Sequence, residues 1–167
     1  MIVVLDLDDT LYPEISFVKG GFKAVSKLLS KKIHLGEKKI KDRLNYILSN
    51  YGRGKVFDIF LEENNVKNLS LVKECLLTYR YHSPKIKLYA DANKLIGRLD
   101  KQAYIVTDGN KIVQKRKTEA LKLTKRMKKI FITHNYGIKR AKPSIYCFKK
   151  IKELENCRWD EMMYIGD

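Results

Sequence analysis

The segment Ile2–Thr10, with the sequence IVVLDLDDT, decides how the rest of the chain is interpreted. Its first four residues are isoleucine, valine, valine and leucine, and such a short apolar run predicts a buried strand of a parallel sheet. Two carboxylates, Asp6 and Asp8, follow within three positions. Because ligands of parallel α/β sheets bind at the carboxyl ends of the strands, this segment predicts a sheet and also the edge at which a site lies.

The residues that follow this segment have a helical period. From residue 14 to about residue 83, apolar side chains recur every three or four positions in four stretches, which is typical of amphipathic helices. The turn Tyr51–Gly54 (YGRG) separates the second of these helices from the third, and Ser70 is a plausible N-cap of the fourth. We therefore predict an all-helical block over residues 14–83.

Beyond residue 84, predicted helices and strands alternate. We expect strands at 103–107, 129–133 and 162–165 and helices at 91–99, 111–126 and 144–155. Alternation of this kind predicts a parallel sheet with helices on its faces. The expected fold class is α/β, with a Rossmann-like parallel-sheet core of residues 1–13 and 84–167 and an all-helical cap, residues 14–83, inserted after the first strand.

The carboxylate pair suggests a cation site. Asp6 and Asp8 are close enough to repel each other unless a cation neutralises them or one of them is protonated. A few hard oxygen donors suit Mg²⁺. A second interpretation is that Asp8 and Asp9 only cap the turn into the next helix, and these residues alone leave both interpretations open.

Four motifs, taken in order, resemble those of the haloacid dehalogenase superfamily. The first is an apolar strand followed by Asp6, Asp8 and Thr10 in a DxDxT pattern. The other three are Val106–Asn110 (VTDGN), Lys142–Pro143 with Phe148 downstream, and Met163–Asp167 (MYIGD). Their order and spacing are similar to those of the family, and the resemblance covers the whole chain.

The resemblance implies an Mg²⁺-dependent phosphomonoester hydrolase that acts on a small phosphorylated metabolite, such as a nucleotide or a sugar phosphate. Asp6 would be the nucleophile that forms an aspartyl-phosphate, and Asp8 would be the general acid and base. Lys142 would stabilise the charge on the phosphoryl group. The implied metal ligands are Asp6, the backbone carbonyl of Asp8, and Asp167. The acid at position 8 favours the phosphatase branch of the family over the dehalogenase branch.

The resemblance also implies substrate-binding residues. Thr107 would hydrogen-bond a phosphoryl oxygen, although it could be an ordinary threonine at a strand end. Asn110 could serve only as the N-cap of the basic helix, whose backbone amides can help to bind phosphate. The remaining candidates of this kind in the motifs are Thr10, Asp108 and Gly109.

The helical block is similar in size and period to the cap that the family inserts between its first two motifs. Arg53 lies in the glycine-containing turn between two predicted cap helices. There it could recognise an anionic or ring-bearing leaving group, or it could belong to a solvated turn. Together with the first motif, this cap resembles most the nucleotidase and sugar-phosphate phosphatase branch.

The fourth motif departs from the family pattern. In the family a second acid follows a few residues later, whereas this sequence ends at Asp167. We therefore expect a C-terminally truncated member with weak Mg²⁺ affinity and low phosphatase activity. The alternative function is that of a catalytically impaired protein that binds phosphate-bearing ligands or a partner.

The charge and composition bound the remaining possibilities. The chain has 35 Lys and Arg against 19 Asp and Glu, a net charge of +16, and the excess is concentrated in residues 111–142. Such a segment can bind nucleic acid, but a solvated helix face is the favoured interpretation, so a nucleic-acid partner is unlikely. The three cysteines lack CxxC spacing, so we expect neither disulfides nor structural zinc. Without a signal-like or membrane-spanning segment, the expectation is a cytoplasmic monomer or weak dimer that binds no membrane.

Overall fold

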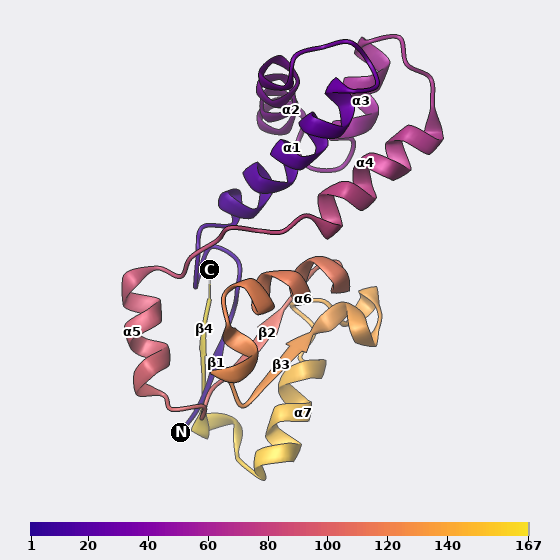
Figure 1. Ribbon diagram of the computed structural model, residues 1–167. Coiled ribbons are helices and arrows are strands. Elements are labelled where there is room, and N and C mark those ends of the chain that lie inside the picture. Colours follow the sequence, from indigo (N-terminus) through magenta and orange to yellow (C-terminus); the bar gives the residue numbers. More distant parts are fainter. Residues whose placement is uncertain (167) are drawn as a thin grey trace. The chain divides into compact units, whose positions relative to one another are not determined.

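Four short strands form the parallel sheet that the alternating pattern predicts (Figure 1). The structure, a computed structural model, describes residues 1–166. The strands lie side by side in the order β3-β2-β1-β4 and pair in parallel throughout. Their bounds are β1 Ile2–Leu5, β2 Tyr104–Thr107, β3 Lys129–Ile132 and β4 Met162–Ile165. The predicted α/β fold class is thereby confirmed.

Helices connect these strands, as parallel pairing requires. In this part of the chain they are α5 Ala90–Arg98, α6 Lys111–Ala120 and α7 Tyr146–Glu155, with 3-10 helices at Leu123–Lys125, Thr133–Tyr136, Ile138–Arg140 and Trp159–Glu161. α7 covers one face of the sheet, where Cys147 and Ile151 pack with Val4, Val106 and Phe131. Figure 1 shows α5 on the other side of the strands from α7.

One predicted helix is interrupted. The expected basic helix over 111–126 ends at Ala120, and a separate 3-10 turn spans Leu123–Lys125. Between them Lys122 has a φ of 58°, in the left-handed region, which ends an α-helix. The helical period alone could not show this break, because the residues on both sides of it are good helix formers.

The chain divides into two compact units. Met1–Glu14 and the chain from Lys85 onward form the first, and Ile15–Pro84 form the second. The second unit contains α1 Glu14–Ser30 from its second residue on, α2 Glu37–Tyr51, α3 Val56–Glu63 and α4 Leu69–Tyr81. No helix within residues 1–166 is both long enough and apolar enough to cross a membrane.

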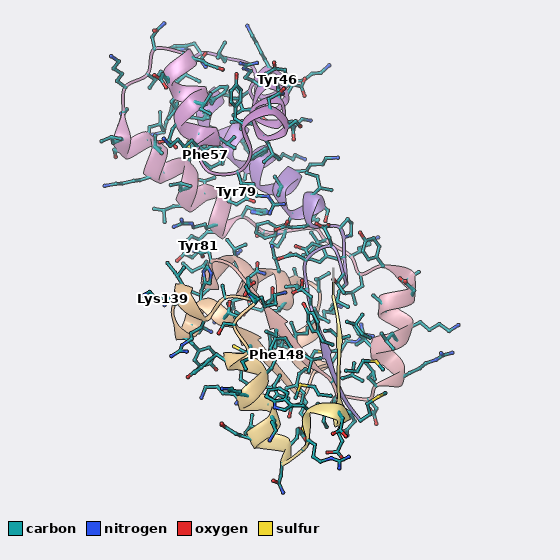
Figure 2. All side chains as sticks on the ribbon, turned by 180° about the vertical axis from the view of Figure 1, so that it is seen from behind. Tyr46, Phe57, Tyr79, Tyr81, Lys139 and Phe148 are labelled. Atoms are coloured by element: carbon teal, nitrogen blue, oxygen red, sulfur yellow. The ribbon has the colours of Figure 1, made fainter. Side chains whose placement is uncertain are left out.

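The four helices of the second unit bury one apolar core. It includes Phe22 of α1, Leu44 of α2 and Phe57 of α3, each almost fully buried. The rings of Phe57 and Tyr79, both labelled in Figure 2, pack edge to face in this core, with centroids 6.0 Å apart. The N-cap of α4 is Asn68, whose side chain accepts a hydrogen bond from the backbone of Leu71, so the expectation of a Ser70 cap is wrong.

Candidate functional site

Polar residues at the ends of three strands lie at one edge of the sheet. Asp6 follows β1 directly, Thr107 is the last residue of β2, and Thr133 follows β3. Because all four strands run in the same direction, their carboxyl ends share this edge. The topology thus brings together side chains that are more than a hundred residues apart in the sequence.

Asp6 is buried at the end of β1 and pairs with Lys142. The side chain of Lys142 reaches it with an Nζ–Oδ1 distance of 2.7 Å, and the backbone N–H of Asp6 donates to the carbonyl of Ile165. Burial raises the pKa of Asp6 above its ordinary value, and the hydrogen bond with Lys142 opposes that rise. Asp6 is therefore a poorly solvated carboxylate with a cation beside it, which is a suitable setting for a nucleophile.

Both the backbone N–H and the ammonium group of Lys142 are hydrogen-bonded. Its backbone N–H donates to both carboxylate oxygens of Asp108, at 3.1 and 3.2 Å, and Thr133 donates to Asp108 at 2.6 Å. Its ammonium group also donates to the hydroxyl of Tyr164, at 3.0 Å. Desolvation disfavours the charge on Lys142, but the hydrogen bonds to Asp6 and Tyr164 outweigh it and raise the lysine pKa. The lysine is thus held as a cation.

Asp8 accepts hydrogen bonds from three different side chains. The hydroxyl of Tyr12 and the ammonium of Lys117 both donate to Oδ1 at 2.7 Å, and the amide of Gln114 donates to Oδ2 at 2.7 Å. The same amide nitrogen of Gln114 lies 2.6 Å from the hydroxyl oxygen of Thr107. Burial and the nearby Asp8 carboxylate raise the pKa of Tyr12, so its hydroxyl stays protonated and can donate.

Asp9 caps the following helix. Oδ1 of Asp9 accepts from the backbone N–H of Glu14, the first residue of α1, at 2.8 Å. Asp9 has a φ of 55°, which directs the chain from the strand end into the turn. The capping interpretation is therefore correct for Asp9, whereas Asp8 accepts from the three side chains described above.

The loop after β2 has two residues whose backbone geometry matters. Gly109 has a φ of 118°, which side-chain-bearing residues rarely adopt, and the side chain of Gln114 lies 3.5 Å from the position of a Cβ there. Asn110 caps α6, because its side-chain oxygen accepts from the backbone of Ile112 and Val113. Its side chain thus holds the helix start, and its role toward a substrate stays a prediction.

The remaining predicted site residues are Thr10, Arg53 and Asp167. Thr10 buries its Oγ1 atom, which has no hydrogen-bond partner in the described part of the chain. Arg53 lies in the turn between α2 and α3 of the second unit, and its predicted role stays a prediction. Asp167 lies outside the described residues.

Two oxygen donors at this edge are of the type that a divalent cation requires. Asp6 offers a buried carboxylate and Asp8 a backbone carbonyl, both hard oxygen donors of the kind Mg²⁺ prefers. Within residues 1–166 no group of three or more His, Cys, Asp or Glu residues is arranged to hold a metal. The described donors therefore fit Mg²⁺ in chemical type.

Sequence reasoning did not single out Tyr12, Gln114 and Lys117. Gln114 and Lys117 belong to a stretch rich in lysine that resembles a solvated surface helix. The available signal was their spacing of three residues, which places both side chains on one face of a helix directly after the second motif.

Comparison with known proteins supports the fold. A family model described as haloacid dehalogenase-like hydrolase matches residues 3–167. One similar solved structure is that of a HAD hydrolase, YfnB from Bacillus subtilis, bound to magnesium. It is 20% identical in sequence, with a TM-score of 0.63, and the match covers 99% of this chain and 77% of that one. No curated protein matches the sequence.

Two further structures have different described activities. A 2-haloacid dehalogenase from Pseudomonas syringae is 18% identical with a TM-score of 0.64, covering 100% of this chain and 78% of that one. A HAD phosphatase from Thermococcus onnurineus is 19% identical with a TM-score of 0.56, covering 99% of this chain and 76% of that one. At such identities the likeness shows the fold alone.

Proposed function

Because the chain belongs to the family of haloacid dehalogenase-like hydrolases, we propose that it is an Mg²⁺-dependent phosphomonoester hydrolase. Its substrate is a small phosphorylated metabolite, a nucleotide or a sugar phosphate. The observation that carries this proposal is the arrangement of two carboxylates around one strand end. Asp6 has Lys142 beside it, and Asp8 has its own separate set of donors.

The reaction proceeds in two displacements at phosphorus. In the first, a carboxylate oxygen of Asp6 attacks phosphorus, the bond to the leaving oxygen breaks, and protonated Asp8 gives its proton to that oxygen. In the second, Asp8 takes a proton from water, whose oxygen attacks phosphorus. The bond between Asp6 and phosphorus then breaks, inorganic phosphate leaves, and Asp8 is protonated again for the next cycle.

Two side chains bind the phosphoryl oxygens. Lys142 is held as a cation beside Asp6, where negative charge develops on the transferring group. Thr107 accepts a hydrogen bond from Gln114, so its hydroxyl retains its own hydrogen to donate to an anion. Mg²⁺, held by Asp6, the carbonyl of Asp8 and Asp167, would reduce the repulsion between an anionic nucleophile and an anionic phosphate.

Dehalogenation is the competing activity, since structures of both kinds share the fold. A dehalogenase releases halide, which leaves without a proton and needs no acid at position 8. The network around Asp8 therefore favours the phosphatase. Arg53, in the second unit, is the proposed contact with the non-phosphoryl part of the substrate.

The test is product release from a panel of substrates. We expect the purified chain with Mg²⁺ to release phosphate from members of a nucleotide and sugar-phosphate panel, and to release no halide from a short 2-halo acid. Asp9→Asn is the matched control, because asparagine retains capping ability next to the site. Halide release, or phosphate binding without turnover at any Mg²⁺ concentration, would contradict the proposal.

A further inference from the structure

The buried face of α6 is polar, which is unusual for a helix that packs on a sheet. Its buried residues are Gln114, Lys117 and Thr118, whereas helices of this kind normally bury apolar side chains. The Lys117 side chain is only 3% exposed, although Lys115 on the same helix is 72% exposed. Something other than apolar packing therefore determines which residues face inward.

Both polar side chains converge on Asp8. Lys117 holds Oδ1, and Gln114 holds Oδ2, so the carboxylate is fixed at both oxygens by two residues one helical turn apart. Lys117 also pairs with Glu14 at 3.1 Å. Gln114 links Asp8 to Thr107 through one amide nitrogen. A single rigid helix thus sets the rotation of the Asp8 side chain and its position relative to the end of β2.

The buried ion pair between Lys117 and Asp8 would contribute little to the free energy of folding. A buried ion pair gains little over apolar residues of similar volume, because the desolvation of both charges offsets their attraction. Proton transfer, in contrast, needs the acid within hydrogen-bond reach and correctly oriented, and small misplacements lower the rate strongly. Orientation of the acid is therefore a benefit that an apolar residue at position 117 could not provide.

We propose that Lys117, with Gln114, is a positioning residue that holds Asp8 for proton transfer to and from the substrate oxygen. This inference rests on the proposed phosphatase function. The two residues act through Asp8, and Gln114 also donates to Thr107.

The test compares leaving groups in Lys117→Met. For β-glycerophosphate, whose alkoxide must be protonated, we expect kcat to fall at least about tenfold, with KM changed by less than about threefold. For p-nitrophenyl phosphate, whose leaving group needs little protonation, the loss is smaller. Lys117→Arg restores part of the loss, and the exposed matched control Lys115→Met behaves like the parent.

A second variant and a second measurement keep the test informative if Lys117→Met does not fold. Gln114→Met removes the other donor to Asp8 with little change in volume. Loss of its bond to Thr107 should affect both esters alike, so the excess loss of kcat for β-glycerophosphate over p-nitrophenyl phosphate should match that of Lys117→Met. Thermal unfolding of Lys117→Met, Asp8→Asn and the double variant forms a cycle that reports their contact without turnover. The double variant should be less destabilised than the sum of the two single variants.

The possible results distinguish the positioning role of Lys117 from the proposed phosphatase function. Equal losses of kcat for both substrates, or a change confined to KM, would overturn the positioning role. Additive effects in the unfolding cycle would also overturn it, because the two side chains would then not interact. A parent chain that hydrolyses neither ester, together with a coupled unfolding cycle, would instead contradict the phosphatase function and leave the Lys117–Asp8 contact established.

Discussion

The ammonium nitrogen of Lys142 lies 2.7 Å from Oδ1 of Asp6, and the backbone of the same lysine is bound by Asp108. Asp108 follows β2, and the lysine comes from the loop that precedes α7. The pair between a cation and a buried carboxylate is thus fixed by hydrogen bonds from a third element. In the proposed function, these contacts place the positive charge where a phosphoryl group would meet Asp6.

Removal of that charge should reduce turnover. We expect Lys142→Met to lower kcat by about 10²–10³-fold, the usual loss when a group that stabilises transition-state charge is deleted. Lys142→Arg should retain more activity, because it keeps the charge. Steady-state phosphate release measures this effect. The control is Lys139→Met, an exposed lysine three residues earlier (Figure 2), and an equal loss in that variant would show that the effect is not specific to Lys142.

Two helix glycines should respond in opposite ways to alanine. A Cβ on Gly21 of α1 would lie 2.4 Å from the ring of Tyr79, whereas one on Gly97 of α5 would meet nothing within 4 Å. We expect Gly21→Ala to destabilise the protein by about 1–3 kcal/mol through overpacking. Gly97→Ala should stabilise it by about 0.5–1 kcal/mol through helix propensity. Urea unfolding of both variants checks this, and a tolerated alanine at position 21 would contradict the packing of α1 against α4.

The ion pair of Glu155 should give a pH-dependent contribution to stability. Hydrogen bonds from Lys128 and from the hydroxyl of Tyr104 lower the pKa of Glu155 below its ordinary value of 4.5. The folded chain therefore binds fewer protons than the unfolded chain between those two values, and the free energy of unfolding rises with pH there. The stabilisation is complete above the ordinary value and disappears as the pH falls through the lowered one.

Glu155→Gln should accordingly cost about 1–2 kcal/mol at pH 7, and the difference from the parent should shrink toward zero in acid. Urea unfolding at several pH values measures it. Glu153→Gln, an exposed position on the same helix, is the control and should show no such trend. A constant difference across the pH range would mean that ionisation of Glu155 is not involved.

The parallel sheet could be predicted from the sequence because its strands are short apolar runs with polar residues at their ends. Strand β4 was expected at 162–165 and lies there, and Asp6 follows β1 as expected. The N-cap of α4 was harder to predict, because two neighbouring residues could each cap the helix. Asn68 and Ser70 are both good capping residues, and in the structure it is Asn68 whose side chain accepts from the backbone of Leu71.

The surroundings of Asp8 could not be predicted. They depend on which face of α6 turns inward, and a helix with so many lysines has no apolar stripe to indicate it. The family resemblance implied that Lys142 belongs to the site, whereas its ion pair with Asp6 and its anchoring by Asp108 depend on the path of a loop. Sequence spacing places residues at the same edge of the sheet, but only side-chain packing decides which donor reaches which carboxylate.

The most direct measurement of the central claim is the location of the phosphoryl group during turnover. The chain is mixed with substrate and Mg²⁺ and quenched in acid, and its peptides are analysed by mass spectrometry. We predict a phosphorylated peptide whose modified residue is Asp6 in the parent and in Asp9→Asn, and neither modification nor turnover in a folded Asp6→Asn variant. Parental turnover by Asp6→Asn, or a phosphoryl group on another residue, would contradict the account.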